Sequence, residues 1–406
     1  REEGGSSMLC VVAALALFPS LLISTSAFRL HIQRRAFWRA DRHSWRRRRG
    51  LRHLLHMTAP PADDSSADRP RQLFDDVRIP ALLRDPVIEK IEEIGGGKVT
   101  EVKEVTPGPG LFNRHFLYTA TGGTFLCKQN ERNTTANFRC EMESLNALRN
   151  TRTLRVPESF AVGHLPLGGA FLLMEHIQFV PFGASIPSTL AKLGEQLAQL
   201  HMMPCGNDRG VGKYGWTSHN FLGGTIQDNT WRTSFRDFCI MNRLLPLYNE
   251  ASRRFACPAA DDGIERFGPR LFERADAILS EVDQTTPSLL HGDLWLGNCG
   301  ADSDRNPVVY DPACWSGAAE FDLAISTLFG GFGPAFYHAY HHHLPQQPGF
   351  HQRQQLYRLY HLLNHLNLYG KGFGSSGTAR DPQGYYERAK QLMREIVAGG
   401  GCDFPS

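Results

Sequence analysis

Two short segments near residue 300 constrain the fold of this chain more than any other feature. The first reads LLHGDLWLGN over residues 289–298; it places His-Gly-Asp after an apolar pair and an asparagine five positions beyond the aspartate. The second reads PVVYDP over residues 307–312 and predicts a short buried strand that presents Asp311 at its end. The combined spacing of Asp293, Asn298 and Asp311 is far more specific than an isolated His-Gly-Asp.

This spacing is typical of enzymes that transfer a phosphoryl group from ATP. In such enzymes one aspartate accepts the proton of the substrate hydroxyl, while an asparagine and a second aspartate hold magnesium ions. Phosphoryl transfer requires mainly positioning and charge compensation, so it needs hard oxygen ligands at fixed intervals. We therefore expect ATP and Mg²⁺ as cofactors. The structural alternative is an ordinary turn with capping aspartates.

Matching parts occur earlier in the chain. Lys128 ends a predicted strand (FLCK), from which its ammonium can reach the α- and β-phosphates of a nucleotide. The next segment, 135–150, has helical periodicity and carries Glu141 on the side of its apolar face, and Glu143 is the competing residue. Because a buried lysine without a partner is costly, we expect Lys128 to pair with Glu141. An exposed strand lysine is the alternative.

A glycine-rich stretch, PGPG at 107–110, stands where a phosphate-covering loop is expected. We assign Gly108 and Gly110 to this loop, although Pro109 removes one backbone N–H that could bind a phosphate oxygen. A plain β-turn is an equal alternative. The stretch matches neither a Walker-type loop nor a dinucleotide-binding fingerprint.

The order of the predicted elements indicates an α+β fold with two lobes, resembling that of protein kinases. Residues 88–130 have a strand-like pattern, 170–176 read as a buried strand, and 190–201 read as an amphipathic helix. We predict a small lobe with an antiparallel sheet over residues 72–176. A larger helical lobe that carries the catalytic loop follows over residues 177–406.

The N-terminal part reads as a targeting leader over residues 1–57. Residues 9–27 are mostly apolar and end in small residues, like a secretory signal, although a membrane anchor is an alternative. After Phe28, residues 29–53 contain ten arginines and one acid, as transit peptides do. A signal, a small-small-Phe junction and a basic transit segment together resemble the two-part leader of algae with complex plastids. The alternatives are a solvated basic tail, an ordinary secretory signal and a cytoplasmic protein.

Residues 58–71 are rich in Pro, Ser and Asp and predict a disordered linker before the folded part. The formal net charge of the whole chain is only +3, so the part that follows the arginine-rich segment is mildly acidic. This balance argues against nucleic acid as a partner. We also expect no stable membrane association once the leader is removed. The nine cysteines include no C-x-x-C pair, which excludes a zinc knuckle or a disulfide framework and agrees with a reducing compartment.

The two segments near residue 300 also resemble a known family. LLHGDLWLGN, together with VVYDPACWSGAAEFDLAISTLFGGFG, FRCEMESLNALR, FLLMEH and FLGGTIQDNTW, is similar to the fructosamine kinase (ketosamine 3-kinase) family. That family lies within the aminoglycoside-phosphotransferase-like fold, and the resemblance covers about residues 85–400. It implies ATP- and Mg²⁺-dependent phosphorylation of the sugar 3-hydroxyl of fructosamines or ribulosamines on proteins. The phosphorylated adduct then releases the amine, which reverses glycation.

The resemblance also implies roles for individual residues. It makes Asp293 the catalytic base and Asn298 and Asp311 the metal ligands, with Lys128 and Glu141 as the nucleotide pair. The segment Met174, Glu175 and His176 would hold adenine through backbone groups, and Trp295 would face the sugar; a buried structural tryptophan is the alternative. The substrate-side segment would contain Asn220, Thr225, Gln227, Asn229 and Trp231.

Several features remain open or are read as structural. The cluster His338, His341, His342 and His343 is interpreted as a solvated helix end, because consecutive helical residues point in different directions. His361 and His365 are interpreted as a satisfied polar face among core leucines, and Asp322 as an anchor of the catalytic loop. A kinase of another small hydroxyl substrate, choline- or aminoglycoside-like, and a nucleotide-binding pseudokinase scaffold are the functional alternatives. The sequence leaves the oligomeric state undetermined.

Overall fold

The computed structural model of this protein describes residues 85–105, 113–132, 134–180, 186–203, 205, 212–256, 263–283, 285–371 and 384–400. The predicted leader and linker, and the pair Gly108 and Gly110, lie outside these ranges and stay predictions. Within the described ranges, none of the helices combines the length and the apolar character that crossing a bilayer requires.

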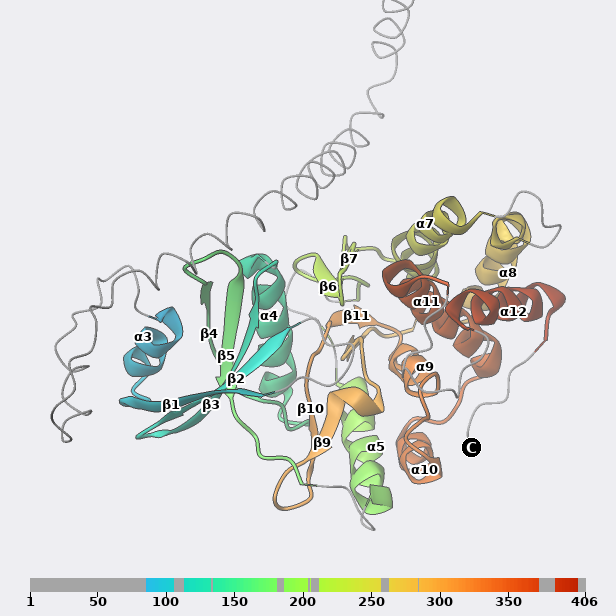
Figure 1. The fold of residues 1–406 in the computed structure, drawn as a ribbon. Helices are drawn as coiled ribbons and strands as arrows, with labels where there is room; N and C mark the ends of the chain where they lie inside the picture. The colour runs from blue at the N-terminus through green and yellow to red at the C-terminus, as the bar shows by residue number, and fades with distance from the viewer. Residues whose placement is uncertain are drawn as a thin grey trace, which may run out of the picture. The chain divides into compact units, whose positions relative to one another are not determined.

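A five-stranded antiparallel sheet forms the core of the first lobe (Figure 1), with strand order β1-β2-β3-β5-β4. Its strands are β1 (Val99–Val105), β2 (Arg114–Ala120), β3 (Gly123–Asn130), β4 (Ser159–His164) and β5 (Ala170–Glu175). The predicted strands at 125–128 and 170–176 are thereby confirmed. β5 inserts between β3 and β4, so it is covered by a neighbouring strand on both edges.

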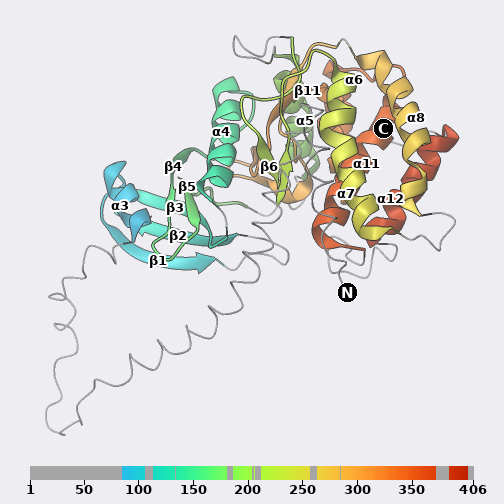
Figure 2. The same cartoon turned by 90° about the horizontal axis from the view of Figure 1, so that it is seen from above.

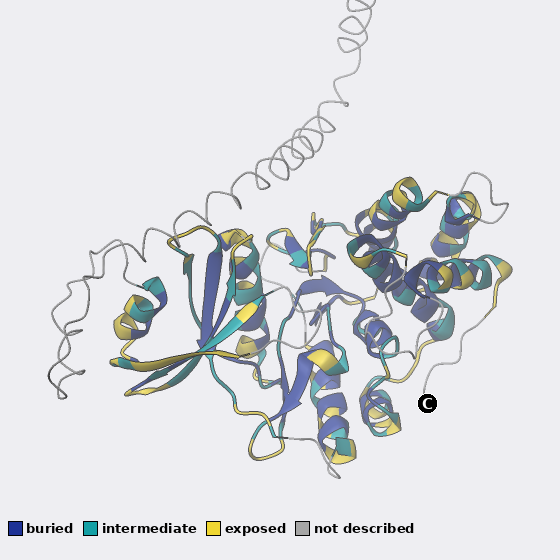
Figure 3. Ribbon diagram, in the orientation of Figure 1, coloured by how far each residue is buried: buried dark blue, intermediate teal, exposed yellow. Residues whose placement is uncertain are grey.

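Helices α3 (Pro86–Glu93) and α4 (Thr135–Thr151) cover opposite faces of this sheet (Figures 1 and 2). Successive side chains of β5 point to opposite faces of the sheet, so one strand packs against both helices. Phe171 and Leu173 pack in the cluster that contains α3, whereas Leu172 and Met174 pack in the cluster that contains α4. All of β5 before Glu175 is therefore buried, which Figure 3 shows as a continuous dark strand.

The strand-like reading of residues 88–93 was wrong, because these residues belong to helix α3. Asp85 caps this helix: its side chain accepts a hydrogen bond from the backbone N–H of Val87 at 2.9 Å. Pro86 occupies the first helical position, where its missing N–H costs nothing. An Asp-Pro pair before an amphipathic segment is thus a helix start that the periodicity argument overlooked.

The second lobe is mainly helical. Its helices are α5 (Ile186–Met202), α6 (Phe235–Phe238), α7 (Leu245–Phe255), α8 (Gly268–Leu279), α9 (Asp322–Ser326), α10 (Pro334–His343), α11 (Phe350–Tyr369) and α12 (Gly384–Ala398). A six-residue π-helical stretch, Cys239–Leu244, joins α6 to α7. The predicted helix at 190–201 is confirmed within α5, whose four inward leucines are buried: Leu190, Leu193, Leu197 and Leu200. The α+β class and the two-lobed arrangement are as predicted.

Among the described residues of the second lobe, three two-stranded sheets hold the irregular segments. They pair β6 (Asn220–Leu222) with β7 (Thr225–Gln227), β8 (Ser288–Leu290) with β11 (Trp315–Gly317), and β9 (Cys299–Ala301) with β10 (Pro307–Val309). The His-Gly-Asp loop leaves β8, and Asp311 follows β10. Short antiparallel strand pairs therefore hold both segments that carry the predicted catalytic residues.

Candidate active site

The loop after β8 is fixed by a carboxylate from another helix. Asp322, the first residue of α9, accepts hydrogen bonds from the backbone N–H groups of His291 and Gly292 at 2.6 and 2.7 Å. The imidazole of His201 lies 3.2 Å from the same carboxylate, and all of these groups are buried. The predicted anchoring role of Asp322 is confirmed by these contacts.

Gly292 allows the loop to dock closely. Its φ is +82°, a region that favours glycine, and a Cβ at this position would lie 2.2 Å from the carbonyl oxygen of Ala313. The neighbouring His291 carbonyl accepts a hydrogen bond from the Ala313 N–H at 2.8 Å. The His-Gly-Asp loop is therefore packed against the segment that follows Asp311.

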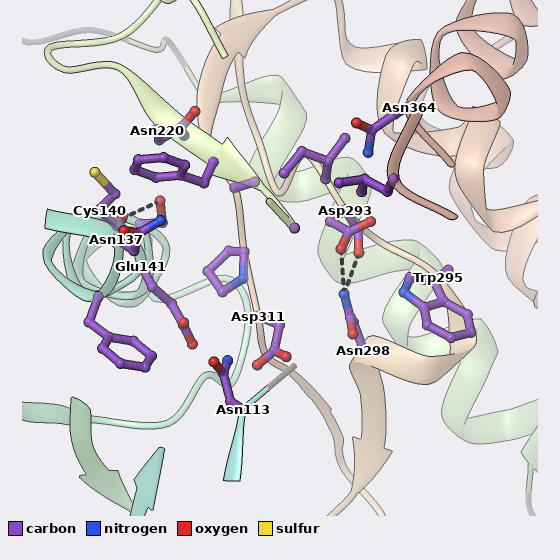
Figure 4. Close-up of a pocket in the computed structure, with 18 of the residues that line it drawn as sticks. Asn113, Asn137, Cys140, Glu141, Asn220, Asp293, Trp295, Asn298, Asp311 and Asn364 are labelled. Carbon is purple, nitrogen blue, oxygen red and sulfur yellow. Dashed lines mark hydrogen bonds between the residues drawn. The ribbon is translucent and has the colours of Figure 1, made fainter. Parts of the chain in front are cut away.

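Asn298 contacts Asp293 directly (Figure 4). Its side-chain amide donates to the backbone oxygen of Asp293 at 2.9 Å and to the carboxylate at 3.0 Å. Because the amide nitrogen faces Asp293, the amide oxygen points to the opposite side and is left for another partner. The spacing of five residues thus brings the two side chains together, as the sequence predicted.

The surroundings of Asp293 disfavour its charged form. Burial, and then the negative charge of Asp311, raise the pKa of Asp293 well above its usual value, while the hydrogen bond from Asn298 opposes this shift. A carboxylate with a raised pKa is a stronger base than an ordinary aspartate. The site therefore contains a carboxyl group suited to accept a proton from an alcohol.

Asp311 occupies an unusual backbone conformation. It follows β10 with φ at +57°, a left-handed geometry that non-glycine residues rarely adopt. Tyr310, the residue before it, donates its N–H to the carbonyl oxygen of Asn298 at 3.1 Å, so the two loops are joined by a backbone hydrogen bond. Strained backbone of this kind is common where function fixes a side chain's position.

Lys128 joins the two lobes. It lies on β3 and is 3% exposed, and its ammonium is 2.5 Å from the carboxylate of Glu141 on α4 and also contacts the carboxylate of Asp311. Burial opposes the charge of Lys128, but the two carboxylates outweigh it and raise its pKa. The predicted pairing with Glu141 is observed, whereas Glu143 accepts a hydrogen bond from the Ser218 hydroxyl at 2.9 Å.

A pocket of about 240 Å³ brings these groups together. Residues from both lobes line it, among them Glu141, Asn220, Asp293, Trp295, Asn298 and Asp311 (Figure 4). The indole of Trp295 is placed by its surroundings: it packs 5.5 Å from the ring of Phe329, and a Cβ on Gly297 would meet it at 2.3 Å. Trp295 therefore lines the pocket, and its contact with the sugar stays a prediction.

The segment predicted to hold adenine lies at the end of β5. Met174 is buried in the sheet, and Glu175 forms a bidentate ion pair with Arg155 and donates its N–H to the carbonyl of Glu158 at 2.7 Å. The side chain and the N–H of Glu175 are thus already bonded. His176 is the first residue after the strand.

The predicted substrate-side residues divide into two groups. Asn220 lines the pocket, but Gln227 and Asn229 are 3% and 1% exposed and do not line it. Their side chains bond to Tyr360, Arg243 and Asn220 inside the lobe. Trp231 is partly exposed and is likewise absent from the pocket lining, and so is Thr225. The structure therefore places Gln227 and Asn229 behind the pocket wall.

The sequence reasoning missed the contribution of α11. Asn364, His365, Leu368 and Tyr369, all near its C-terminal end, line the same pocket as Asp293. Asn364 is 2% exposed, and its amide oxygen has no hydrogen-bond partner among the described residues (Figure 4). These residues follow Asp293 by about seventy positions and carry no motif, so only the fold reveals them.

The interpretation of His361 and His365 as a satisfied polar face was wrong in part. His361 is 1% exposed and, among the described residues, neither of its ring nitrogens has a hydrogen-bond partner. His365 bonds through Nδ1 to the carbonyl of His361 at 2.8 Å, which makes Nδ1 the protonated nitrogen. Burial lowers the pKa of His365 to about 4, so its ring is neutral at physiological pH.

The histidines at the end of α10 form no metal site. His338, His342 and His343 are exposed, as predicted, while His341 is partly buried and bonds to the carbonyl of Leu344 at 3.0 Å. Across the part of the chain that the structure describes, no three His, Cys, Asp or Glu side chains are grouped so as to hold a metal ion. A metal at Asp311 and Asn298 would need further ligands, which a nucleotide's phosphates provide.

The sequence and the fold both match known proteins. The profile of the fructosamine kinase family matches residues 85–380. The chain is 39% identical over 297 residues to "Protein-ribulosamine 3-kinase, chloroplastic" of Oryza sativa subsp. indica, covering 73% of this chain and 82% of that protein. It is 36% identical over 312 residues to the protein of the same name from Arabidopsis thaliana, covering 76% and 89%.

A solved structure agrees with these relatives. A putative fructosamine-3-kinase from Haemophilus somnus 129PT matches with a TM-score of 0.64 at 27% identity. The match covers 76% of this chain and 96% of that one. The similarity therefore extends over both lobes and includes the pocket between them.

Proposed function

This chain belongs to the fructosamine kinase family, and we propose that it transfers the γ-phosphoryl group of ATP to the 3-hydroxyl of a ketosamine. The substrate is a fructosamine or ribulosamine adduct on a protein or on a free amine. The observation that carries this proposal is the convergence of Asp293, Asn298 and Asp311 on one pocket that Glu141 also lines, with Lys128 paired to both Glu141 and Asp311.

In this proposal Asp293 is the general base. Its carboxylate accepts the proton of the 3-hydroxyl as the oxygen attacks the γ-phosphorus, and the bond from phosphorus to the bridging oxygen of ADP breaks. Asn298 positions the carboxylate through the 3.0 Å hydrogen bond. The raised pKa of Asp293 supports the role, because it strengthens the base.

Asn298 and Asp311 are proposed to hold magnesium. The fit rests on donor chemistry: the amide oxygen of Asn298 faces away from Asp293, and Asp311 offers a partly exposed carboxylate from the same pocket wall. Bound Mg²⁺ would neutralise charge on the phosphates. Lys128 would neutralise the remaining charge, with Glu141 fixing its position, while the backbone at His176 would receive the adenine.

The acceptor side is proposed to combine an apolar face with hydrogen-bonding groups. The indole of Trp295 suits the C–H face of a sugar, because it gives apolar contact without competing for hydroxyl groups. The amide of Asn364 and the Nε2 lone pair of neutral His365 suit the hydroxyl and ammonium donors of a ketosamine. A quaternary ammonium such as choline has no N–H to offer them.

We further propose that the protein acts in a plastid. The arginine-rich segment 29–53 after Phe28 supports this location, and so do the names of the rice and Arabidopsis relatives, which are called chloroplastic. A fluorescent fusion of residues 8–58 is expected to accumulate in plastids. A cytosolic signal would contradict this part of the proposal without affecting the proposed reaction.

The reaction is tested by incubating the full chain with Mg-ATP and a panel of fructosamines, ribulosamines, choline and aminoglycosides. We expect turnover of the ketosamines. Turnover of choline or aminoglycosides alone would contradict this proposal and would identify the protein as a kinase of another small hydroxyl substrate. Nucleotide binding without turnover of any acceptor would instead favour a pseudokinase scaffold.

A further inference from the structure

We propose that Arg243 is a positioning residue for the acceptor side of the pocket, acting through a chain of buried amides that ends beside Asp311. This inference rests on the proposed function for its kinetic consequence. Arg243 belongs to the π-helical stretch Cys239–Leu244 and is 1% exposed. Such π-helical insertions interrupt regular helices and are frequent at functional sites.

The charge of Arg243 is held without a carboxylate partner. Its guanidinium lies 4.5 Å from the ring centres of both Phe238 and Trp315. Its acceptors are neutral: the carbonyls of Asp228 and Asn242 at 2.8 and 3.1 Å, and the side-chain oxygen of Asn229 at 2.5 Å. Within the described residues no carboxylate forms an ion pair with it. Burying a cation in this way is costly, and the two aromatic faces and the three acceptors offset part of that cost, although Nε has no partner among the described residues.

The third acceptor starts a directed chain of hydrogen bonds. Because Arg243 can only donate, the amide oxygen of Asn229 must face it, and the Asn229 nitrogen then donates to the Asn220 oxygen at 2.9 Å. The Asn220 nitrogen in turn donates to the carbonyl oxygen of Cys314 at 2.7 Å. A carbonyl can only accept, so the orientation of both amides is fixed at each end of the chain.

Gln227 and Tyr360 complete the network. Gln227 donates to the same oxygen of Asn220 at 2.9 Å, and Tyr360 of α11 donates to the Gln227 oxygen at 2.7 Å. All members of the network are buried. The cation at its start polarises the successive hydrogen bonds and strengthens them. Three residues that the family resemblance placed on the substrate side, Asn220, Gln227 and Asn229, thereby obtain a structural explanation.

The chain joins the two walls of the acceptor side. Asn220 and residues 221–223 of the β6–β7 hairpin line the pocket, and so do Asp311, Pro312 and Ala313, which directly precede Cys314. The Asn220–Cys314 hydrogen bond ties the hairpin to the Asp311 segment. Arg243 does not line the pocket itself, yet it fixes the amide that sets the distance between these walls. Small displacements of positioning groups have large kinetic effects.

The deciding variant is Asn229→Asp in the full chain. The carboxylate keeps the acceptor for Arg243 and adds a counter-charge, but it removes the donors to Asn220 and to the Ser218 carbonyl. The chain is therefore broken while Arg243 remains paired. We expect the KM for the ketosamine to rise about tenfold, with the KM for ATP changed less than twofold, because the nucleotide groups Lys128 and Glu141 lie in the other lobe.

Amide hydrogen exchange gives a second measurement that needs no substrate. In Asn229→Asp, exchange is expected to become at least about tenfold faster in residues 220–227, with α8 unchanged. Arg243→Lys is the second variant, in which a compact ammonium replaces the planar guanidinium. We expect the same changes in exchange rate and ketosamine KM as in Asn229→Asp, but smaller ones. Leu271→Ala, in the core of α8, is the matched control and should lower Tm without changing either KM.

The outcomes separate this inference from the proposed function. Unchanged hairpin exchange and unchanged ketosamine KM in a folded Asn229→Asp would overturn the positioning role. Equal changes in both KM values, or the same pattern in Leu271→Ala, would show that the variants act by lowering the stability of the whole protein. Either result would also overturn the positioning role. If the wild-type chain phosphorylates no ketosamine, the proposed function fails, and the exchange measurement alone decides whether the chain orders the hairpin.

Discussion

The side-chain amide of Asn298 holds the carboxylate of Asp293 at 3.0 Å and the backbone oxygen of the same residue at 2.9 Å. One asparagine therefore sets the position of the proposed base and, through its amide oxygen, also faces the proposed metal position. The spacing of five residues lets the Asn298 side chain reach both Asp293 and the proposed metal position. A shift of either residue would separate the base from the group that orients it.

Removing the Asn298 side chain is expected to impair both uses. In Asn298→Ala we expect kcat to fall roughly 10- to 100-fold, together with a higher Mg²⁺ concentration at half-maximal rate. The measurement is a magnesium titration of the kinase rate. Asn306→Ala, in the turn between β9 and β10, is the matched control. An unchanged Mg²⁺ dependence in Asn298→Ala would rule out the ligand role.

The raised pKa of Asp293 predicts a pH-dependent stability difference. Because the folded-state pKa lies above the unfolded value of about 3.9, ionisation of Asp293 destabilises the folded protein at neutral pH, and this penalty is absent below the unfolded pKa. Asp293→Asn should therefore have a higher Tm than the wild type at pH 7–8. The difference should shrink toward pH 4 in thermal melts, and a lower Tm at pH 8 would contradict the assignment.

The Lys128–Glu141 pair predicts energetic coupling in nucleotide use. Lys128→Met and Glu141→Gln should each lower kcat/KM for ATP, and the double variant should lose less than the sum of the two losses. We expect a coupling energy of about 0.5–3 kcal/mol from a double-mutant cycle on kcat/KM. Glu143→Gln, on the same helix, is the control with an expected change under twofold. Additive losses would show that the two residues act separately.

The contribution of α11 predicts a selective effect on the acceptor. Asn364→Leu removes a buried amide that lines the pocket and has no partner for its oxygen among the described residues. We expect the KM for the ketosamine to rise about 3- to 10-fold and the KM for ATP to stay constant, as loss of one hydrogen bond would give. An unchanged ketosamine KM would place Asn364 outside the acceptor site.

The sequence predicted the parts of the site that are defined by local spacing. Asp293 lies in the loop after β8, Asn298 directly precedes β9 and Asp311 follows β10, so short intervals in the chain bring them together. The pairing of Lys128 with Glu141 is predictable because a buried lysine needs a partner, which the next helix provides. In each case one physical requirement connects residues that are close in the chain.

Other features could not be read from local patterns. Gln227 and Asn229 belong to a segment that resembles the family's substrate side. Whether their side chains face the pocket or the interior depends on Arg243, and its π-helical segment has no sequence signal. Asn364 and His365 reach the pocket only because α11 packs across the lobe. Their polar side chains among the leucines of α11 are visible in the sequence, yet their position relative to Asp293 is a property of the tertiary fold.

The most direct test of the proposed reaction is to locate the transferred phosphate by ³¹P NMR. The full chain, Mg-ATP and a fructosamine are expected to give a product whose phosphorus couples to the proton on C3, followed by release of the free amine. Asp293→Ala should form this product about 10²- to 10⁴-fold more slowly. Phosphate on another oxygen, no phosphorylated fructosamine, or a loss under tenfold in Asp293→Ala would contradict the proposed function.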